Sequence, residues 1–76
     1  MIRLEYRGGS SNKFYELHLE EADGRVTVTG YYGAIGRAPK AHFIYDGTSR
    51  EVADRMLEKK KTEKVNKGYV EVVTGM

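Results

Sequence analysis

Aromatic and basic side chains meet in the stretch Tyr31–Arg37, which reads YYGAIGR, and Lys40 follows three residues later. A tyrosine ring offers a flat face on which a base or sugar can stack, and such stacking contributes about 1–3 kcal/mol per base. Arginine and lysine side chains bind phosphate oxygens. Rings and cations this close together are typical of a surface that binds nucleic acid.

Tyr31 and Tyr32 cannot both be buried in the core of a regular sheet. Tyr31 and Tyr32 are neighbours in a segment that reads as a strand, and successive side chains of a strand point to opposite faces of the sheet. Both rings can be buried together only if Gly30 introduces a bulge. We expect one ring to be exposed beside Arg37. The alternative is that one ring is core and the other merely covers the sheet.

The glycines of this stretch do not form a nucleotide-binding loop. Gly30, Gly33 and Gly36 are three residues apart, which fits neither G-x-G-x-x-G nor a P-loop with its lysine. The G-x-x-G of Gly33–Gly36 occurs in RNA-clamping loops, but those loops join helices and this one joins strands. We therefore interpret these glycines as residues of a strand connection that needs positive φ angles.

A second basic group lies on the expected helix. Val52, Ala53, Met56 and Leu57 form one apolar arc at helical spacing. Further along the same side, the apolar residues give way to lysines: Lys60, Lys64 and Lys67. Two interpretations remain open. The lysine stems can cover the sheet edge while their ammonium groups stay in water, or the lysines can face an anionic partner.

Enzyme chemistry finds little support in the sequence. His18 shares a strand face with Glu16 and Glu20, and His42 could approach them if their strands were neighbours. Such histidines are usually plain surface residues. The absence of cysteine excludes disulfides, cysteine-ligated zinc and thiol nucleophiles. We expect no enzyme activity, no metal site and no cofactor.

Length and charge narrow the class of protein further. The chain has 76 residues, which predicts a single domain over residues 1–76. Its net charge of +2 is unevenly spread, because residues 55–76 carry six basic and three acidic side chains whereas residues 1–24 carry three and five. This asymmetry suggests an anionic partner. No membrane span or signal peptide is recognisable, so the expected location is cytoplasmic.

Alternating and helical patterns predict the elements that position these residues. Strands are expected at 2–7, 13–21, 25–32 and 40–45, with a helix from about 49 to 65. Residues 69–73 are expected to form a short final strand or an extended tail. Residues 8–12 are expected to form a flexible loop, and Asp23-Gly24 a hairpin turn. In the fourth strand Ala41, Phe43 and Tyr45 should share one face.

The ends of the helix and the side of one aromatic ring can also be predicted. Thr48 is expected to cap the helix N-terminus together with Glu51, and Gly68 to stop it. Phe14 falls on the polar side of its strand, opposite Tyr15.

Three short motifs are spread along the chain: Asn12–Glu16 reads NKFYE, Tyr32–Gly36 reads YGAIG and Lys64–Tyr69 reads KVNKGY. Together they resemble motifs of the WGR domain family, found in DNA-dependent poly(ADP-ribose) polymerases and in many bacterial proteins. The first is similar to the family's opening strand, the second falls where the family has W-G-R-[IV]-G, and the third is similar to its K-x-x-K-G-Y. The resemblance spans about residues 2–73.

The resemblance implies an α+β fold, a small twisted antiparallel sheet of four to five strands with one helix packed across it. It also implies DNA binding at breaks, with Tyr32 as the stacking residue and Gly33 permitting close approach. Tyr32 replaces the family's tryptophan and Ala34 its arginine. Arg37 and Lys40 could restore the lost charge from nearby.

The leading functional hypothesis is therefore a non-catalytic nucleic-acid-binding module, with weak and salt-dependent binding to DNA ends, nicks or backbone rather than RNA. The residues expected to carry it are Tyr32, Gly33, Arg37, Lys40, Lys60, Lys64 and Lys67. The alternative is a protein–protein interaction module that has lost DNA binding, because the signature arginine is missing at Ala34. A monomer is expected, although edge strands would allow a dimer.

Overall fold

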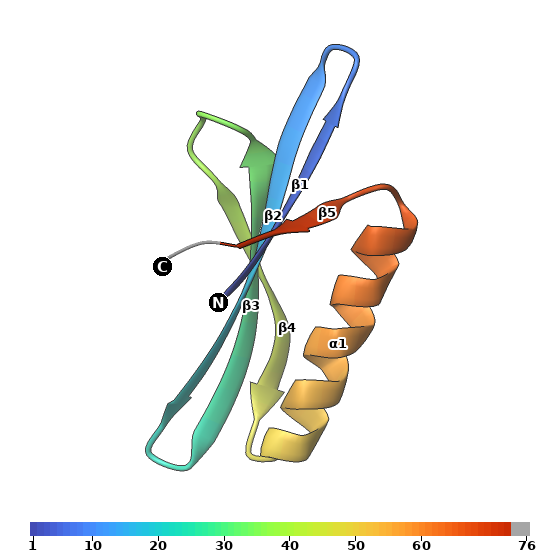
Figure 1. Ribbon diagram of the computed structural model, residues 1–76. Coiled ribbons are helices and arrows are strands. Elements are labelled where there is room, and N and C mark those ends of the chain that lie inside the picture. Colours follow the sequence, from blue (N-terminus) through green and yellow to red (C-terminus); the bar gives the residue numbers. More distant parts are fainter. Residues whose placement is uncertain (74–76) are drawn as a thin grey trace.

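A computed structural model describes residues 1–73 of the chain and shows one sheet with one helix across it (Figure 1). The strand order is β4-β3-β2-β1-β5, and every pair of neighbours is antiparallel. The elements are β1 (Ile2–Gly8), β2 (Ser11–Ala22), β3 (Arg25–Ala34), β4 (Lys40–Gly47), α1 (Arg50–Asn66) and β5 (Val70–Val72). This arrangement confirms the expected α+β class and the five-stranded form of the sheet.

The first three strands follow one another through tight turns. Asp23 and Gly24 have φ angles of 53° and 78°, and they join β2 to β3 as the Asp-Gly pair predicts. The expected flexible loop at residues 8–12 is wrong. Gly8 pairs with Ser11, so only two residues remain between β1 and β2. The sequence suggested a loop because glycine and serine are weak strand formers, but pairing with the neighbouring strand overrides that preference.

The core lies between α1 and the face of the sheet that it covers. Leu4, Leu17 and Val28, from three adjacent strands, are fully buried there. The helix contributes Ala53, which is also fully buried, and Leu57 packs against the same cluster. The apolar arc predicted from helical spacing is thus the side that faces the sheet.

A bulge in β4 overturns the alternation expected for that strand. Val28 pairs with Tyr45 while the next residue of β3, Thr29, pairs with Phe43, so Ile44 is an extra residue. Ile44 and Tyr45 both pack against the core. Phe43 is instead 73% exposed. The prediction that Phe43 shares a face with Tyr45 is therefore wrong, because one inserted residue reverses the alternation.

The helix N-terminus is capped by Ser49 and not by Thr48, which corrects the sequence-based prediction. The Ser49 hydroxyl accepts a hydrogen bond from the Val52 N–H at 3.2 Å, and the Ser49 N–H donates to the Tyr45 hydroxyl at 3.1 Å. Threonine and serine are both good caps, so sequence alone did not separate them. At the other end Gly68 takes a φ of 103° directly after the C-cap, as predicted.

This cap gives a direct test of the helix start. Replacing Ser49 by alanine should lower the free energy of unfolding by about 1 kcal/mol, because the Val52 N–H loses its acceptor. Thr48→Ala is the matched control and should change it by less than about 0.5 kcal/mol. Urea unfolding followed by circular dichroism measures both. Equal losses for the two variants would contradict the assignment of the cap.

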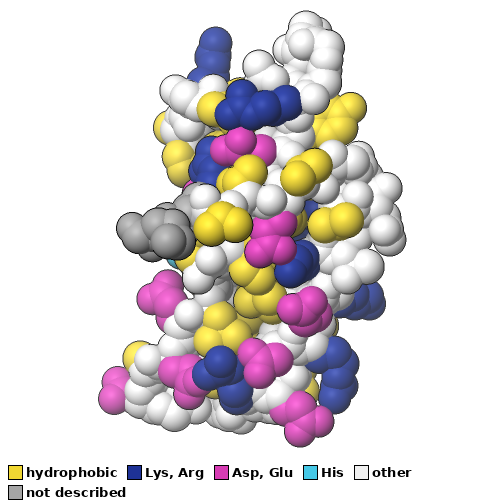
Figure 2. All heavy atoms as spheres, viewed as in Figure 1, with side chains coloured by type: hydrophobic (Ala, Val, Ile, Leu, Met, Phe, Trp, Pro, Cys, Tyr) yellow, Lys and Arg dark blue, Asp and Glu magenta, His cyan; other side chains and the backbone are white. Residues whose placement is uncertain are grey.

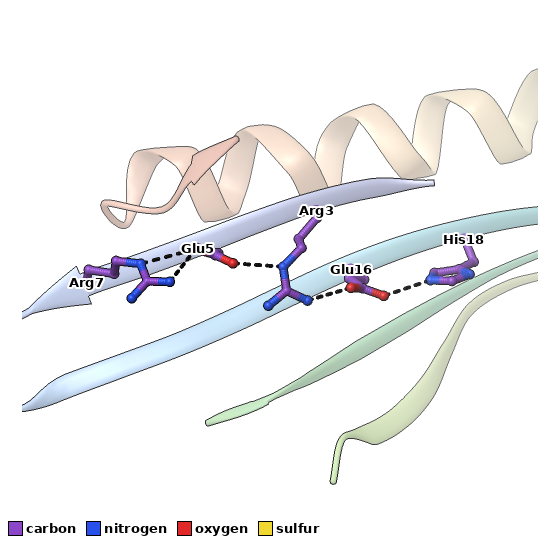
Figure 3. Close-up of polar contacts among 5 residues, drawn as sticks. All are labelled: Arg3, Glu5, Arg7, Glu16 and His18. Atoms are coloured by element: carbon purple, nitrogen blue, oxygen red, sulfur yellow. Dashed lines mark hydrogen bonds and ion pairs between the residues drawn. The ribbon is translucent and has the colours of Figure 1, made fainter. Parts of the chain in front are cut away.

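Within residues 1–73 the opposite face of the sheet, the open face, has no helix over it, and it carries a row of charged side chains (Figure 3). The Arg3 guanidinium donates to Glu5 at 2.8 Å and to Glu16 at 2.6 Å. Arg7 and His18 extend the row at its two ends. Hydrogen bonds from Arg3, with Arg7 adding to them, hold the pKa of Glu5 below its usual value despite partial burial.

Two further features of this face follow from its charges. Burial alone would raise the pKa of Glu16, but hydrogen bonds from His18 and Arg3 outweigh it and lower the pKa overall. Phe14 lies on this face, as predicted, and is only 7% exposed. The Arg3 guanidinium carbon lies 4.6 Å from the Phe14 ring centroid, so the charged row also covers an aromatic ring.

Among the described residues, one face of the molecule carries no large patch of a single kind of side chain (Figure 2). On the face shown in Figure 2, hydrophobic side chains are interspersed with basic and acidic ones. Within residues 1–73, α1 is neither apolar nor long enough for a bilayer crossing.

Candidate nucleic-acid interface

Tyr32 presents an exposed ring on the helix-covered side of the sheet, beyond the end of the core. Its ring stacks on that of Tyr15, with centroids 6.2 Å apart and planes 20° from parallel. The His42 ring meets it edge-on at 5.4 Å. Tyr32 is nevertheless 38% exposed. The ring is therefore held from two sides and still accessible to a ligand.

Tyr31 points to the other face of the sheet, as strand alternation requires. It is half-buried, and its ring meets the His18 ring edge-on at 4.7 Å. The expectation that one of the two tyrosines is exposed is thus confirmed for Tyr32. It also follows that His18 and His42 lie on opposite faces and do not converge.

Gly30 makes the packing of these rings possible. A Cβ at this position would lie 2.5 Å from the Tyr15 hydroxyl oxygen and 2.7 Å from the His42 Nε2. These two atoms are themselves 2.6 Å apart and within hydrogen-bond distance. Burial raises the pKa of Tyr15 to about 12, so its hydroxyl keeps a proton that it can donate to Nε2. Gly30 thus permits the close approach of Tyr15 and His42, while the bulge lies on the neighbouring strand at Ile44, opposite Val28 and Thr29.

Lys64 reaches the same group of rings from the helix. Its Nζ lies 4.7 Å from the Tyr15 ring centroid and 5.7 Å from that of Tyr69. Partial burial lowers the pKa of Lys64, and the positive charges of Lys67 and Lys60 lower it further. Because Tyr15 contacts both Tyr32 and Lys64, it places an exposed ring and a cation in one cluster.

The other two lysines of the predicted stripe are less available. The Lys60 Nζ lies 3.3 Å from the Glu63 carboxylate, and the Lys67 Nζ lies 3.9 Å from the same group. Both charges are therefore partly neutralised by one acidic residue. Among the described residues, Lys64 is the lysine of the stripe whose Nζ lies against aromatic rings, those of Tyr15 and Tyr69. That the stripe faces an anionic partner stays a prediction.

Arg37 lies in the loop between β3 and β4, and Lys40 is the first residue of β4. Lys40 is the direct cross-strand partner of Tyr32, so the two side chains share a face. Arg37 is exposed in the loop, where its backbone N–H donates to the Ala34 carbonyl at 3.1 Å. Neither side chain forms an ion pair within residues 1–73. Gly33 is half-buried against Phe14 and the same loop.

Sequence reasoning missed three members of this cluster: Tyr15, His42 and Lys13. Lys13 is the cross-strand partner of Ala34, and its positive charge contributes to the lowered pKa of Lys64. The pairing of residues between β2 and β3 indicates that Lys13 belongs to this cluster. Lys13 stands two residues before Tyr15 on the same strand face, and Ala34 stands two residues after Tyr32. Finding it required knowing which residues of β2 and β3 pair.

The comparison with known families agrees with these observations. The sequence matches the family described as the WGR domain over residues 1–76. A search of curated proteins found no match, and neither did a search of solved structures. Together with the five-stranded sheet, the crossing helix and the position of Tyr32, the match shows that the chain belongs to the WGR domain family, a family of nucleic-acid-binding modules.

Proposed function

We propose that this domain binds DNA, at ends, nicks or along the backbone, through the ring of Tyr32 and the cations around it. The observation that carries the proposal is that Tyr32 is exposed while Tyr15 and His42 hold its ring in place. A ring fixed in this way loses little conformational entropy when a base or sugar packs on it. The membership in a family of nucleic-acid-binding modules supports the same proposal.

The basic side chains near the ring supply the charge that DNA binding needs. Lys64 contacts the ring beneath Tyr32, and Lys40 lies directly across from Tyr32. Ala34 stands where the family motif has arginine, and Lys13 is its cross-strand partner. We infer that Lys13 and Lys40 take over the ionic role at this end of the sheet, with Arg37 reaching phosphates from the loop.

Binding of this kind should be weak and strongly salt-dependent, because few phosphates are neutralised. With about three or four phosphate contacts, the logarithm of the association constant should fall with the logarithm of salt concentration with a slope of about −3. The experiment is an NMR titration of the domain with a short nicked duplex at two salt concentrations. Shifts should centre on Tyr32, Lys40 and Lys64. Shifts centred on Tyr31 and the open face, or no shifts at low salt, would contradict the proposal.

Lys64 gives a prediction that separates a phosphate contact from a structural role. Replacing it by glutamine should weaken DNA binding by about fivefold and reduce the steepness of the salt dependence by about 1. Lys61→Gln is the matched control, because Lys61 pairs with Glu71 at 2.8 Å and makes no contact with the rings within residues 1–73. Fluorescence anisotropy at several salt concentrations measures both. An unchanged slope for Lys64→Gln would assign this lysine to packing alone.

The same titration distinguishes the nucleic acids. Single-stranded RNA of the same sequence should bind more weakly than the nicked duplex if the domain recognises a duplex end beside its aromatic ring. We also propose that the domain binds DNA without catalysing a reaction. The alternative of a protein-interaction module is favoured by the free edge of β4.

A further inference from the structure

We propose that the free edge of β4 accepts an extended acidic segment of a partner protein, which adds to the sheet as a sixth strand. β4 is the outermost strand on its side of the sheet. Its first four residues, 40–43, are all exposed. An edge strand carries backbone N–H and C=O groups without a neighbour, and an extended peptide can pair with them. The edge adjoins the Tyr32 face, with which it shares Lys40 and His42, but strand pairing along it does not depend on DNA binding.

The edge of β4 is flanked by a hollow on each side of the sheet. The hollow toward the helix has a volume of about 320 Å³ and lies between β4 and α1. The hollow on the open face has a volume of about 310 Å³ and lies over β3 and β4. His42 and Phe43 line both of them. The two hollows therefore meet at the same stretch of edge.

This arrangement matches what an added strand requires. Successive side chains of a strand point to opposite faces, so a peptide paired with residues 40–43 would direct alternate side chains into the two hollows. Main-chain hydrogen bonds would supply affinity, and the hollows would select the side chains. Outside the sheet and helix ladders, the backbone hydrogen bonds of residues 1–73 involve none of residues 40–47. The outer edge of β4 is thus available for pairing.

The chemistry of the helix-side hollow selects the occupant. Ile44 and Met56 give it apolar walls, and Lys59 and Lys60 stand at its rim with Glu63 as the acidic group. Lys60 pairs with Glu63, whereas Lys59 forms no ion pair among the described residues. Side chains entering from a partner should therefore be acidic or aliphatic.

The open-face hollow selects a different kind of side chain. Thr27, Thr29 and Tyr31 line it with hydroxyl groups, and Glu20 is its acidic group. Small hydrogen-bonding side chains, such as threonine, suit this surface. The expected partner segment therefore alternates polar hydroxyl residues with glutamate or an aliphatic residue.

A second copy of the same chain fits this edge poorly. In a symmetric antiparallel pair the helix-face residues of one β4 would enter the helix-side hollow of the other. Those residues are Lys40 and His42, which pair with Tyr32 and Gly30 of the helix-covered face. They would meet Lys59 and Lys60, so a basic strand would approach a basic rim. The bulge at Ile44 also interrupts the edge, as it often does where sheets avoid self-association.

The test uses a defined probe: an acetylated and amidated ten-residue peptide in which threonine alternates with glutamate or leucine. NMR titration should shift resonances of residues 40–44 and 56–63 and slow amide exchange on β4. A control peptide with N-methylated backbone amides at alternate positions should not bind, because it cannot complete the ladder. Binding of both peptides with equal affinity would overturn the proposal, as would the absence of any shift at about 1 mM peptide.

A charge reversal in the domain tests the choice of partner. Lys59→Glu should weaken peptide binding by about fivefold, since an attractive contact becomes a repulsive one. Arg55→Glu is the matched control on the same helix, because Arg55 is 69% exposed and pairs with Glu51 away from the hollow. Shifts confined to Tyr32 and Lys64 would show that the acidic peptide binds the DNA-binding surface instead. A dimer with protected β4 amides in the absence of peptide would assign the edge to a second copy. Either result would overturn the proposal.

Discussion

Gly30→Ala is expected to lower the free energy of unfolding by about 2–3 kcal/mol, the effect of overpacking a site that has no free space. The new methyl group would lie 2.5 Å from the Tyr15 hydroxyl and 2.7 Å from the His42 Nε2. The Tyr15 hydroxyl cannot move aside easily, because this residue is only 2% exposed and its hydroxyl is within hydrogen-bond distance of the His42 Nε2. A chain of this length has a total stability of about 4–11 kcal/mol, so the loss would be severe.

Chemical denaturation of the purified variant measures this loss, and a compensating variant checks its cause. Adding Tyr15→Phe and His42→Ala removes the two atoms nearest to the new methyl group. The combined variant should then lose less stability than the sum of its separate changes, which is the non-additivity expected of residues in contact. Strict additivity would show that the cost of alanine at position 30 arises elsewhere, and the account of Gly30 would be wrong.

Tyr32→Ala should have the largest effect on DNA binding, a loss of about 5- to 150-fold. This range corresponds to the 1–3 kcal/mol that base–aromatic stacking contributes. Tyr32→Phe should keep most of the affinity, because the flat ring and its stacking on Tyr15 remain. Anisotropy titrations with the nicked duplex compare the variants, and an NMR spectrum of each shows whether the fold persists.

The chain supplies its own matched control for this substitution. Tyr31→Ala removes the same side chain from the adjacent residue, but that ring lies on the opposite face beside His18. It should leave DNA affinity within about twofold, because it touches neither the Tyr32 ring nor the cations near it. If Tyr31→Ala weakened binding as much as Tyr32→Ala in folded protein, the open face would be the binding surface.

Much of the fold follows from local pattern. Alternation predicted the strands of the Tyr15 and Tyr32 segments, and it placed Tyr31 and Tyr32 on opposite faces, as the structure confirms. The Asp23-Gly24 turn and the Gly68 helix stop were predicted because these residues take backbone angles that others avoid. These features are set by a few neighbouring residues, which is why sequence alone indicates them.

Features that depend on strand pairing were not predicted. The bulge at Ile44 moves Phe43 out of the core, and no residue within β4 indicates this bulge from the sequence. Lys13 and His42 join the Tyr32 cluster only through the register of three strands. Lys60 was expected at the site but pairs with Glu63 three residues later on the same helix, a local pair that helical spacing could have indicated. The residue types of the site could be recognised in the sequence, whereas the residues that contact them from other strands could not.

The pairing of the first and last strands has a mechanical consequence. Arg3 pairs with Val72, Leu4 with Glu71 and Glu5 with Val70, so residues near the two ends of the described chain sit side by side (Figure 1). Tension applied through residues 1 and 73 would load these three pairs one after another, as in a zipper, rather than all at once. The domain should therefore open at low force, releasing β5 and then α1 while the hairpins of β1–β4 stay joined.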